Sequence, residues 1–368
     1  MRSFVYALAA VMLWASLVPA PALAKNVWDK RAAYGREMMS KQEKRTYWRD
    51  FLRPTYEGRR FILALDRLAG AGRTLAILRE LGAERPFIVA AALGQGELPD
   101  PDEAEVAMVE VAGGTTMEWL RNVEATMADL PGDVVARIDA WDPTGDAVAL
   151  GPFMFGNARV AGRPLYGGRP DRFVALEDKL IVDALWDRAF IPRAASRNVR
   201  LDAPDLAVAA AELDWGMGTF WVGDATQGWH GGGEIARWVP EPSYAASAHR
   251  YLATKAEAVR VMPFLEGIPC SIYGIVFPDR VITVRPAEML TLRRPQEGAV
   301  TYVGTATFYD PPADVRTAME HAARNVGEVL RHDLDYAGAF TIDGVATRLG
   351  FRCFQLLRVN SCDYSRAI

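Results

Sequence analysis

The chain has 368 residues, of which 50% are hydrophobic and 24% are charged. This length exceeds one ordinary hydrophobic core, so we expect two domains, and the composition excludes a disordered or collagen-like chain. The 42 lysines and arginines nearly balance the 46 aspartates and glutamates, which gives a formal net charge of -4 at pH 7. This balance argues against nucleic acid as a partner.

Cysteine and histidine spacing gives no sign of a disulfide framework or a zinc site. The three cysteines, Cys270, Cys353 and Cys362, form no CxxC pair, and the four histidines show no HExxH spacing. From residue 25 onward, the chain therefore has the character of an α/β protein of a reducing compartment.

Residues 1–24 have the parts of a secretory signal peptide. An uncharged run from Phe4 to Val18 follows Arg2, and small residues precede Lys25. Most of the nearby basic residues follow the run, and the positive-inside rule then favours a cytoplasmic location for the rest of the chain. Two alternatives stay open. The favoured one is a cytoplasmic chain whose membrane contact is confined to residues 4–18, and the other is an exported chain that loses residues 1–24 by cleavage.

Residues 57–172 alternate between strand-length and helix-length patterns. Residues 59–66 and 87–92 are continuous apolar runs, and residues 74–81 between them have helical spacing. A strand over 106–112, a helix over 116–130 and a strand over 134–140 continue the alternation. We therefore predict a small doubly wound parallel-sheet domain of the α/β class, preceded by a polar and aromatic helical connector at 25–56.

Residues 173–368 follow an α+β order. The sequence predicts a helix over 176–189 and a hairpin of strands 219–222 and 234–239. The other predicted elements are helices over 206–213 and 245–258, strands over 259–264, 270–277 and 281–292, a long helix from 310, and strands over 338–343 and 351–355. The long helix carries an apolar stripe, formed by Val315, Met319, Ala322, Val326, Val329 and Leu330.

Three successive glycines, Gly231, Gly232 and Gly233, lie at the tip of the predicted hairpin. Glycine backbone can lie directly against phosphate oxygens, because no side chain intervenes and several N–H groups can converge. Glycine-rich tips also occur in ordinary hairpins, so this motif alone leaves nucleotide binding and a structural turn both open.

The order of elements over residues 173–360 resembles the ATP-grasp superfamily of carboxylate–amine ligases, which includes biotin carboxylase. A lysine-bearing segment comes first, then strand, glycine loop, strand and helix, a strand that ends in a Gly-Ile-Pro turn, a long helix and an Ile-Asp strand. Residues 57–172 are similar to the small α/β domain that precedes this fold. The resemblance implies ATP and Mg²⁺ as cofactors, and small-molecule carboxylate and amine substrates joined through an acyl-phosphate.

The resemblance also implies nucleotide-binding roles for individual residues. Lys179 matches the first lysine on the ATP phosphates, with a surface helix lysine as the alternative. Gly231, Gly232 and Gly233 match the loop that folds over the phosphates. Met262, Phe264 and Leu265 match the hinge whose backbone contacts adenine, where Pro263 removes one N–H.

Three further residues match positions close to the chemistry. Asp343 matches the first magnesium carboxylate, with a satisfied strand-end aspartate as the alternative. Arg285 and Glu288 are the catalytic candidates, because they lie where such ligases place substrate or phosphate arginines; an ion pair between strands is the alternative.

The sequence departs from the family pattern at two places. Gly223 and Asp224 lie where the second phosphate lysine is expected, and an acid beside a triphosphate is unfavourable unless a metal intervenes. In the last strand, Gln355 replaces the metal-binding glutamate and retains only a carbonyl ligand, and Leu357 replaces the asparagine. With the chain ending at Ile368, these changes suggest an altered or truncated C-terminus.

Three functional hypotheses follow. The first is an ATP- and magnesium-dependent ligase. The second is an inactive module that binds a nucleotide or small molecule, which Gln355 and Leu357 favour. The third is an exported solute-binding protein, which residues 1–24 favour and the glycine hairpin disfavours.

Overall fold

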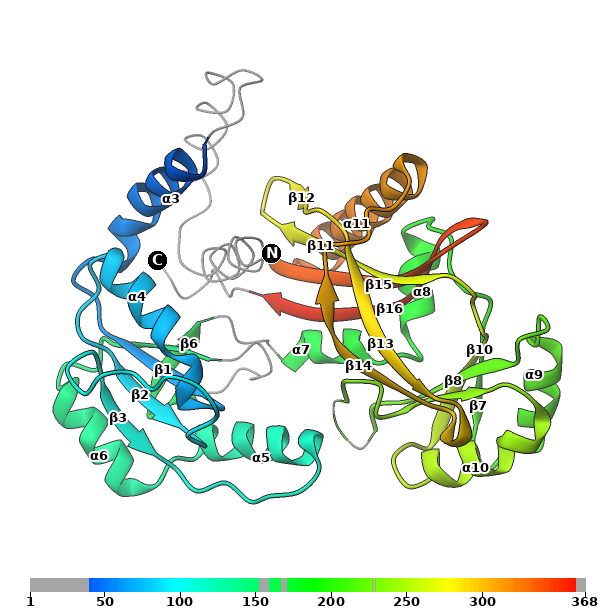
Figure 1. The fold of residues 1–368 in the computed structure, drawn as a ribbon, viewed down its shortest axis with the longest axis horizontal. Helices are drawn as coiled ribbons and strands as arrows, with labels where there is room; N and C mark the ends of the chain where they lie inside the picture. Colours follow the sequence, from blue (N-terminus) through cyan, green and yellow to red (C-terminus); the bar gives the residue numbers. More distant parts are fainter. Residues whose placement is uncertain (1–39, 152–158, 167–170, 227, 229, 362–368) are drawn as a thin grey trace. The chain divides into compact units, whose positions relative to one another are not determined.

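The computed structural model describes residues 40–151, 159–166, 171–226, 228 and 230–361 (Figure 1). The signal-like segment 1–24 and its expected cleavage lie outside these residues. The chain divides into two compact units between Pro170 and Asp171. Within the described ranges, no helix combines the length and the apolar character needed to cross a membrane.

The N-terminal unit is built on a six-stranded sheet in the order β3-β2-β1-β4-β6-β5, which is parallel from β3 to β6. Only β5 runs antiparallel to its neighbour. The strands are β1 (Phe61–Leu65), β2 (Phe87–Ala90), β3 (Glu105–Met108), β4 (Val148–Leu150), β5 (Arg159–Val160) and β6 (Arg163–Tyr166). The helices are α3 (Lys41–Tyr56), α4 (Gly72–Glu80), α5 (Thr116–Ala128) and α6 (Gly132–Trp141).

The order in which strands are added reverses at β1, because β2 and β3 lie on one side of it and β4, β6 and β5 on the other. Ile62 and Ala64 pack in one core with residues of α5 and α6. Phe61 and Leu63, which alternate with them and face the other way, are buried as well. Both faces of the sheet are therefore covered, and the predicted α/β fold class of this region is confirmed.

The strand predicted over 134–140 is wrong, because these residues form α6. Val134 and Ile138 are its buried residues, and their spacing of four is that of a helix face. Asp133 lies in the first turn, where a negative charge favours the helix. The adjacent valines at 134 and 135 favoured a strand locally, but the parallel strand is supplied by β4, which is buried along its length.

The C-terminal unit contains a ten-stranded sheet in the order β16-β15-β11-β13-β14-β9-β8-β10-β7, with β12 beside β11. The register pairings within it are antiparallel, and β9 meets β14 at Ala299 and Arg237. The strands are β7 (Arg197–Arg200), β8 (Thr219–Gly223), β9 (Ala236–Val239), β10 (Ala258–Pro263), β11 (Ile268–Val276), β12 (Val281–Thr283), β13 (Ala287–Arg294), β14 (Ala299–Ala306), β15 (Gly338–Thr347) and β16 (Gly350–Ser361). The helices are α7 (Asp171–Val174), α8 (Val182–Arg188), α9 (Leu206–Glu212), α10 (Pro242–Leu252) and α11 (Ala313–Leu334).

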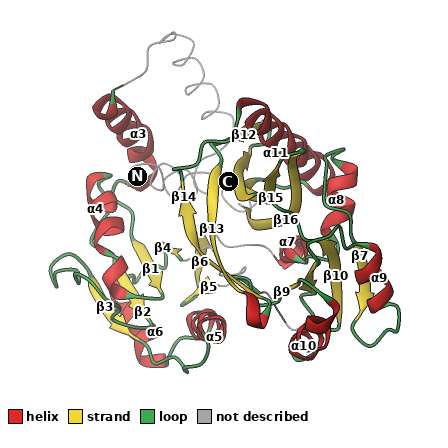
Figure 2. Cartoon of the chain, turned by 45° about the vertical axis from the view of Figure 1, so that its right-hand side comes forward, coloured by secondary structure: helices red, strands yellow, loops and turns green. Residues whose placement is uncertain are grey.

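Two hydrophobic cores lie in this unit. Figure 2 shows α11 near β15 and β16, and α9 near β7 and β10. In the first, α11 packs on β11 and β15, and its predicted apolar stripe is confirmed by the burial of Met319, Val326 and Leu330. In the second, Leu206 of α9 and Leu252 of α10 pack with residues of β7, β8 and β10. The antiparallel sheet with segregated helices confirms the predicted α+β character.

Two predicted elements of this unit are interrupted. The helix predicted over 176–189 is replaced by α7, a 3₁₀ turn at Ala175–Glu177 and α8, and Lys179 lies between the last two. The Asp178 carboxylate accepts a hydrogen bond from the Leu180 N–H at 2.9 Å, which competes with helix formation here. The strand predicted over 281–292 is broken into β12 and β13, with Pro286 in the break, and β14 was missed.

Candidate functional site

Asp343 projects from the face of β15 opposite to α11. Phe340 and Ile342 pack in the core with α11, and side chains alternate along a strand, so Thr341 and Asp343 point to the other face. The Asp343 Oδ1 accepts a hydrogen bond from the Ser271 hydroxyl at 2.6 Å, and Ser271 is its register partner on β11. The Thr341 hydroxyl is buried and has no hydrogen-bond partner in the part of the chain described.

These three side chains offer one carboxylate and two hydroxyl oxygens. Magnesium is typically bound by one or two carboxylates together with phosphates and water. Among the described residues, no three or more histidine, cysteine, aspartate or glutamate side chains come together. Asp343 therefore fits a magnesium ion bound together with a nucleotide, and does not fit a site that the protein forms alone. Gln355 lies on β16, but its side chain and that of Leu357 fall outside the described structure.

Glu288 and Asp343 lie on opposite faces of the sheet. Glu288 is the register partner of Cys270, which packs in the α11 core. Burial raises the pKa of the Cys270 thiol to about 12, and the neighbouring Glu288 charge adds to the rise. Glu288 is thus separated by the sheet from Asp343, and the two do not form one site.

Arg285 is half-exposed in the break between β12 and β13, and its guanidinium lies 3.6 Å from the Asp310 carboxylate. Asp310 also pairs with Arg316 at 2.9 Å. The alternative interpretation was an ion pair between strands, but the partner of Arg285 comes from the segment before α11. The catalytic roles of Arg285 and Glu288 stay predictions.

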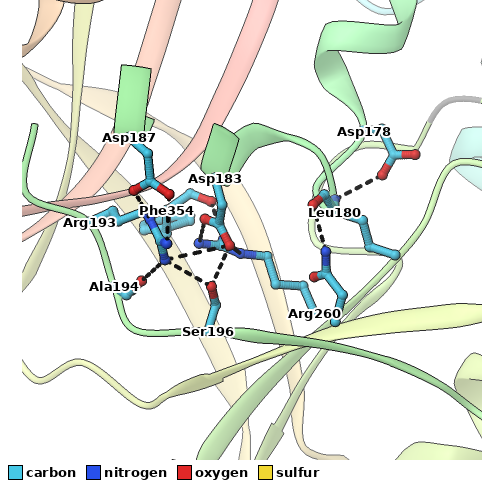
Figure 3. A network of polar contacts seen from close by, with 10 residues as sticks. Asp178, Leu180, Asp183, Asp187, Arg193, Ala194, Ser196, Arg260 and Phe354 are labelled. Atoms are coloured by element: carbon cyan, nitrogen blue, oxygen red, sulfur yellow. Dashed lines mark hydrogen bonds and ion pairs between the residues drawn. The ribbon is translucent and has the colours of Figure 1, made fainter. Parts of the chain in front are cut away.

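Lys179 is buried, with 8% exposure, so it is not a surface helix lysine. Its ammonium donates a hydrogen bond to the Glu177 carbonyl at 2.8 Å. The next residue, Leu180, accepts a hydrogen bond from the Asn198 amide at 2.8 Å (Figure 3). These bonds fix the backbone around Lys179 against β7. A buried ammonium is costly unless acceptors or an anion surround it, which agrees with a phosphate-binding role without testing it.

A buried ion pair lies beside this segment and was missed by sequence reasoning (Figure 3). Arg260 of β10 is fully buried and pairs with Asp183 of α8, with its Nε 3.0 Å from Oδ2. Its Nη1 donates to the Phe354 carbonyl of β16 at 2.8 Å. Burial lowers the pKa of the Arg260 guanidinium, and the Asp183 charge opposes this shift. One arginine thus joins α8, β10 and β16. An arginine inside the apolar run 259–263 was the sequence signal.

The glycine segment connects β8 to β9, which pair antiparallel, so the predicted hairpin is confirmed. The Gly232 carbonyl accepts a hydrogen bond from the Tyr302 N–H at 3.1 Å. Gly233 has a φ of +87°, and a Cβ at this position would lie 2.0 Å from the Val300 carbonyl oxygen. Gly233 is therefore required for close packing on β14. The phosphate-binding role of Gly231, Gly232 and Gly233 stays a prediction.

A histidine, a glutamate and a lysine form a chain of contacts at this loop. The His230 Nδ1 lies 2.9 Å from the Glu234 Oε2, and the Lys255 ammonium donates to the Glu234 Oε1 at 3.1 Å. Burial alone would raise the pKa of the Glu234 carboxyl, but the hydrogen bonds from His230 and Lys255 outweigh burial and lower it. Sequence reasoning missed this group, although His230 directly precedes the three glycines.

Asp224 lies where the second phosphate lysine was expected, and its carboxylate is used within the fold. One oxygen accepts hydrogen bonds from the N–H and the hydroxyl of Thr226, at 3.1 and 2.5 Å. The other accepts from the N–H groups of Glu257 and Ala258, at 3.0 and 2.6 Å. These four donors stabilise the buried charge of Asp224 without any metal ion.

The predicted adenine hinge lies at the end of β10. The Phe264 N–H donates to the Gly218 carbonyl at 3.0 Å, so this N–H is already used within the fold. The Phe264 ring packs against Trp238 at a centroid distance of 4.9 Å, and the Arg293 guanidinium lies 5.2 Å from the Phe264 ring. Met262 is buried on β10. Adenine contacts through Met262 and Leu265 stay predictions.

No protein-family model and no curated protein sequence matches the chain. Several solved structures are similar to it. Biotin carboxylase from Campylobacter jejuni is 15% identical with a TM-score of 0.55, and the match covers 85% of this chain and 67% of that one. The biotin carboxylase domain of the Hydrogenobacter thermophilus 2-oxoglutarate carboxylase, in complex with MgADP and bicarbonate, is 15% identical with a TM-score of 0.55, over 83% of this chain and 65% of that one.

Phosphoribosylamine–glycine ligase from Thermotoga maritima is 12% identical, with a TM-score of 0.52, over 81% of this chain and 68% of that one. Identities this low establish the fold and not the activity. The chain therefore has the ATP-grasp fold that the order of its elements predicted.

Proposed function

We propose that this chain binds Mg-ATP in its C-terminal unit and activates a small carboxylate as an acyl-phosphate, which an amine then attacks. The observation that carries the proposal is the position of Asp343. It is a carboxylate with 2% exposure on the face of the sheet that α11 does not cover. The ATP-grasp fold, which one similar structure combines with MgADP, supports a nucleotide site in this unit.

The proposed roles follow from charge and from backbone access. Lys179 neutralises the phosphates as a point charge, and the backbone of Gly231 and Gly232 lies against them. Asp343 holds the magnesium ion, with Ser271 fixing the orientation of its carboxylate. When bound, magnesium would neutralise phosphate charge that the protein alone does not balance. Met262 and Leu265 contact the adenine edge through their backbone.

Arg285 is the proposed residue for the substrate carboxylate. Its guanidinium is half-exposed, and the 3.6 Å ion pair with Asp310 is loose enough to exchange for a ligand carboxylate. Glu288 does not share the face of Asp343, so we propose no role for it at the metal.

The second candidate is a module that binds the nucleotide without turnover. It is favoured because Asp343 belongs to no group of three or more histidine, cysteine, aspartate or glutamate side chains among the described residues. An exported solute-binding protein fits less well, since such proteins repeat βαβ units in both lobes and the C-terminal unit here is an antiparallel sheet.

Thermal melting of the full chain with and without Mg-ATP tests the nucleotide site. Saturating ligand at about 100 times its dissociation constant adds roughly 2.7 kcal/mol to the stability. We expect a higher midpoint with Mg-ATP, and a smaller rise in Lys179→Ala and Asp343→Asn. The absence of any rise in the unmodified chain would contradict the proposal. ADP release during incubation with pools of carboxylates and amines then separates the ligase from the module.

A further inference from the structure

One ring nitrogen of His230 contacts a carboxylate, and the other is buried and has no hydrogen-bond partner among the described residues. Its side chain is only 4% exposed, and Nδ1 lies against the Glu234 carboxylate. Its Nε2 is buried and has no hydrogen-bond partner within the described ranges. A buried polar atom without a partner costs about 1 to 3 kcal/mol, and in native proteins such an atom often marks a ligand or catalytic position.

The contacts of Glu234 determine the state of the ring. The Glu234 carboxyl is ionised, because His230 and Lys255 lower its pKa, and an ionised carboxylate only accepts hydrogen bonds. Nδ1 must therefore carry the hydrogen. In the neutral ring Nε2 then has a lone pair, and protonation converts Nε2 into a second donor while Glu234 stabilises the positive charge.

The surrounding charges favour an anion as the ligand of Nε2. Residues 219–235, which span β8 and the glycine segment, contain no lysine or arginine, so His230 is the only side chain of this stretch that can become a cation. Lys255 and Glu234 balance each other. The other nearby cation, Arg237, donates to the carbonyls of Glu234 and Ala236. Protonation of His230 thus gives the cluster a net positive charge.

We propose that His230 is the phosphate-contacting side chain of the glycine loop, and that its Nε2 takes up a proton and donates a hydrogen bond to the phosphate oxygens of the bound nucleotide. This inference rests on the proposed binding of Mg-ATP. It supplies a cation at the loop, where β8 has no lysine and the charge of Asp224 is already used within the fold.

The sign of the pH dependence follows from this coupling. A bound phosphate favours the imidazolium over the neutral ring, because its negative charge stabilises the added proton. We therefore expect affinity for Mg-ATP to rise as the pH falls and to decrease as the pH rises.

The test is calorimetric titration of the full chain with Mg-ATP at pH 7.5, in two buffers that differ in ionisation enthalpy. We expect the unmodified protein to take up a fraction of a proton per site. His230→Asn keeps an amide donor near the position of Nδ1, for Glu234, and removes Nε2. It should abolish the proton uptake and weaken binding by about ten- to a hundredfold, the loss typical of a hydrogen bond to a charged group. The control is His321→Asn, which removes an exposed imidazole from α11 and should change neither quantity.

The outcomes separate this inference from the proposed function. If His230→Asn binds Mg-ATP as tightly as the unmodified chain and with the same proton uptake, His230 does not contact the phosphates, although the chain still binds nucleotide. If the unmodified chain does not bind Mg-ATP, both proposals are overturned.

A second measurement is made on the unmodified chain, so its result does not depend on correct folding of the His230→Asn variant. Nitrogen NMR of the unmodified chain, in which four histidines are assigned by substitution, should show Nε2 of His230 gaining a proton when Mg-ATP is added at pH 7.5. An unchanged tautomer and pKa in the nucleotide complex would overturn the inference.

Discussion

The C-terminal unit contains two buried ionic clusters that differ in whether their polar groups have hydrogen-bond partners. Around Arg260, the charge of the guanidinium is matched by Asp183 and by the Phe354 carbonyl, and the cluster connects three elements (Figure 3). Around His230, one ring nitrogen is bonded and the other has no partner among the described residues. The first arrangement is complete within the fold, whereas the second leaves a position for a ligand. A buried polar atom without a partner therefore distinguishes a candidate binding cluster from a structural one.

The largest expected effect on stability comes from breaking the cluster around Arg260. Arg260→Ala leaves Asp183 without its buried partner, and removal of one member of such a pair typically costs about 3 to 5 kcal/mol. Urea unfolding followed by tryptophan fluorescence should show this loss. Arg200→Ala is the control, because Arg200 is 61% exposed and its pair with the exposed Asp202 is worth about 1 kcal/mol or less. Equal costs for the two variants would contradict the comparison.

The glycine segment allows a matched pair of substitutions. Gly233→Ala places a Cβ against the Val300 carbonyl at a positive φ, which should cost about 1 to 3 kcal/mol or displace the loop from β14. Gly232→Ala also has a positive φ, but nothing lies within 4 Å of its Cβ, so only the backbone cost of about 1 kcal/mol applies. Thermal melting compares the two. A larger loss in Gly232→Ala would show that the packing of Gly233 on β14 is misassigned.

Asp343→Asn tests the buried carboxylate on the face of the sheet that α11 does not cover. The amide can still accept the hydrogen bond from Ser271, but it lacks the charge that a magnesium ion needs. We expect affinity for Mg-ATP to fall by about tenfold or more, with little change in the midpoint of the free protein. Calorimetric titration of the unmodified chain and of the variant with Mg-ATP measures this fall in affinity. An equal fall in Glu288→Gln would contradict the separation of Glu288 from Asp343 by the sheet.

The smallest expected effect at neutral pH concerns two buried thiols. Burial raises the pKa of the Cys270 thiol to about 12 and that of the Cys353 thiol further. Both thiols should therefore resist alkylation in the folded chain at pH 8, as read by peptide mass spectrometry. Since the unfolded thiols ionise near pH 8.5, unfolding releases protons above this pH, and stability falls as pH rises from about 8.5 toward 12. Rapid alkylation of Cys270 at pH 8 would contradict its burial.

Sequence patterns predicted the features that depend on local spacing and on the order of elements. They failed for the features that depend on contacts between residues far apart in the chain. The stripe on α11 and the β8–β9 hairpin follow from local spacing and glycine content. The helix over 134–140 was missed because its valines also suit a strand, and the outcome depends on β4 filling the sheet. The burial of Arg260 depends on its partner Asp183, which is 77 positions away in the chain. The unpartnered Nε2 of His230 likewise depends on how distant segments pack around the ring.

The junction between β9 and β14 has a mechanical consequence. The strands of the β7–β10 part and those of the β11–β16 part meet at Ala299 and Arg237, and the Trp238 N–H donates to the Gly298 carbonyl beside this point at 2.7 Å. Along β13 and β14, by contrast, register pairs extend from Glu288 to Arg294. The register pairing of the ten-stranded sheet is therefore narrowest at this point, and we expect its backbone hydrogen bonds to open more readily than those between β13 and β14. The amide hydrogen of Trp238 should then exchange with solvent faster than those in the middle of β13.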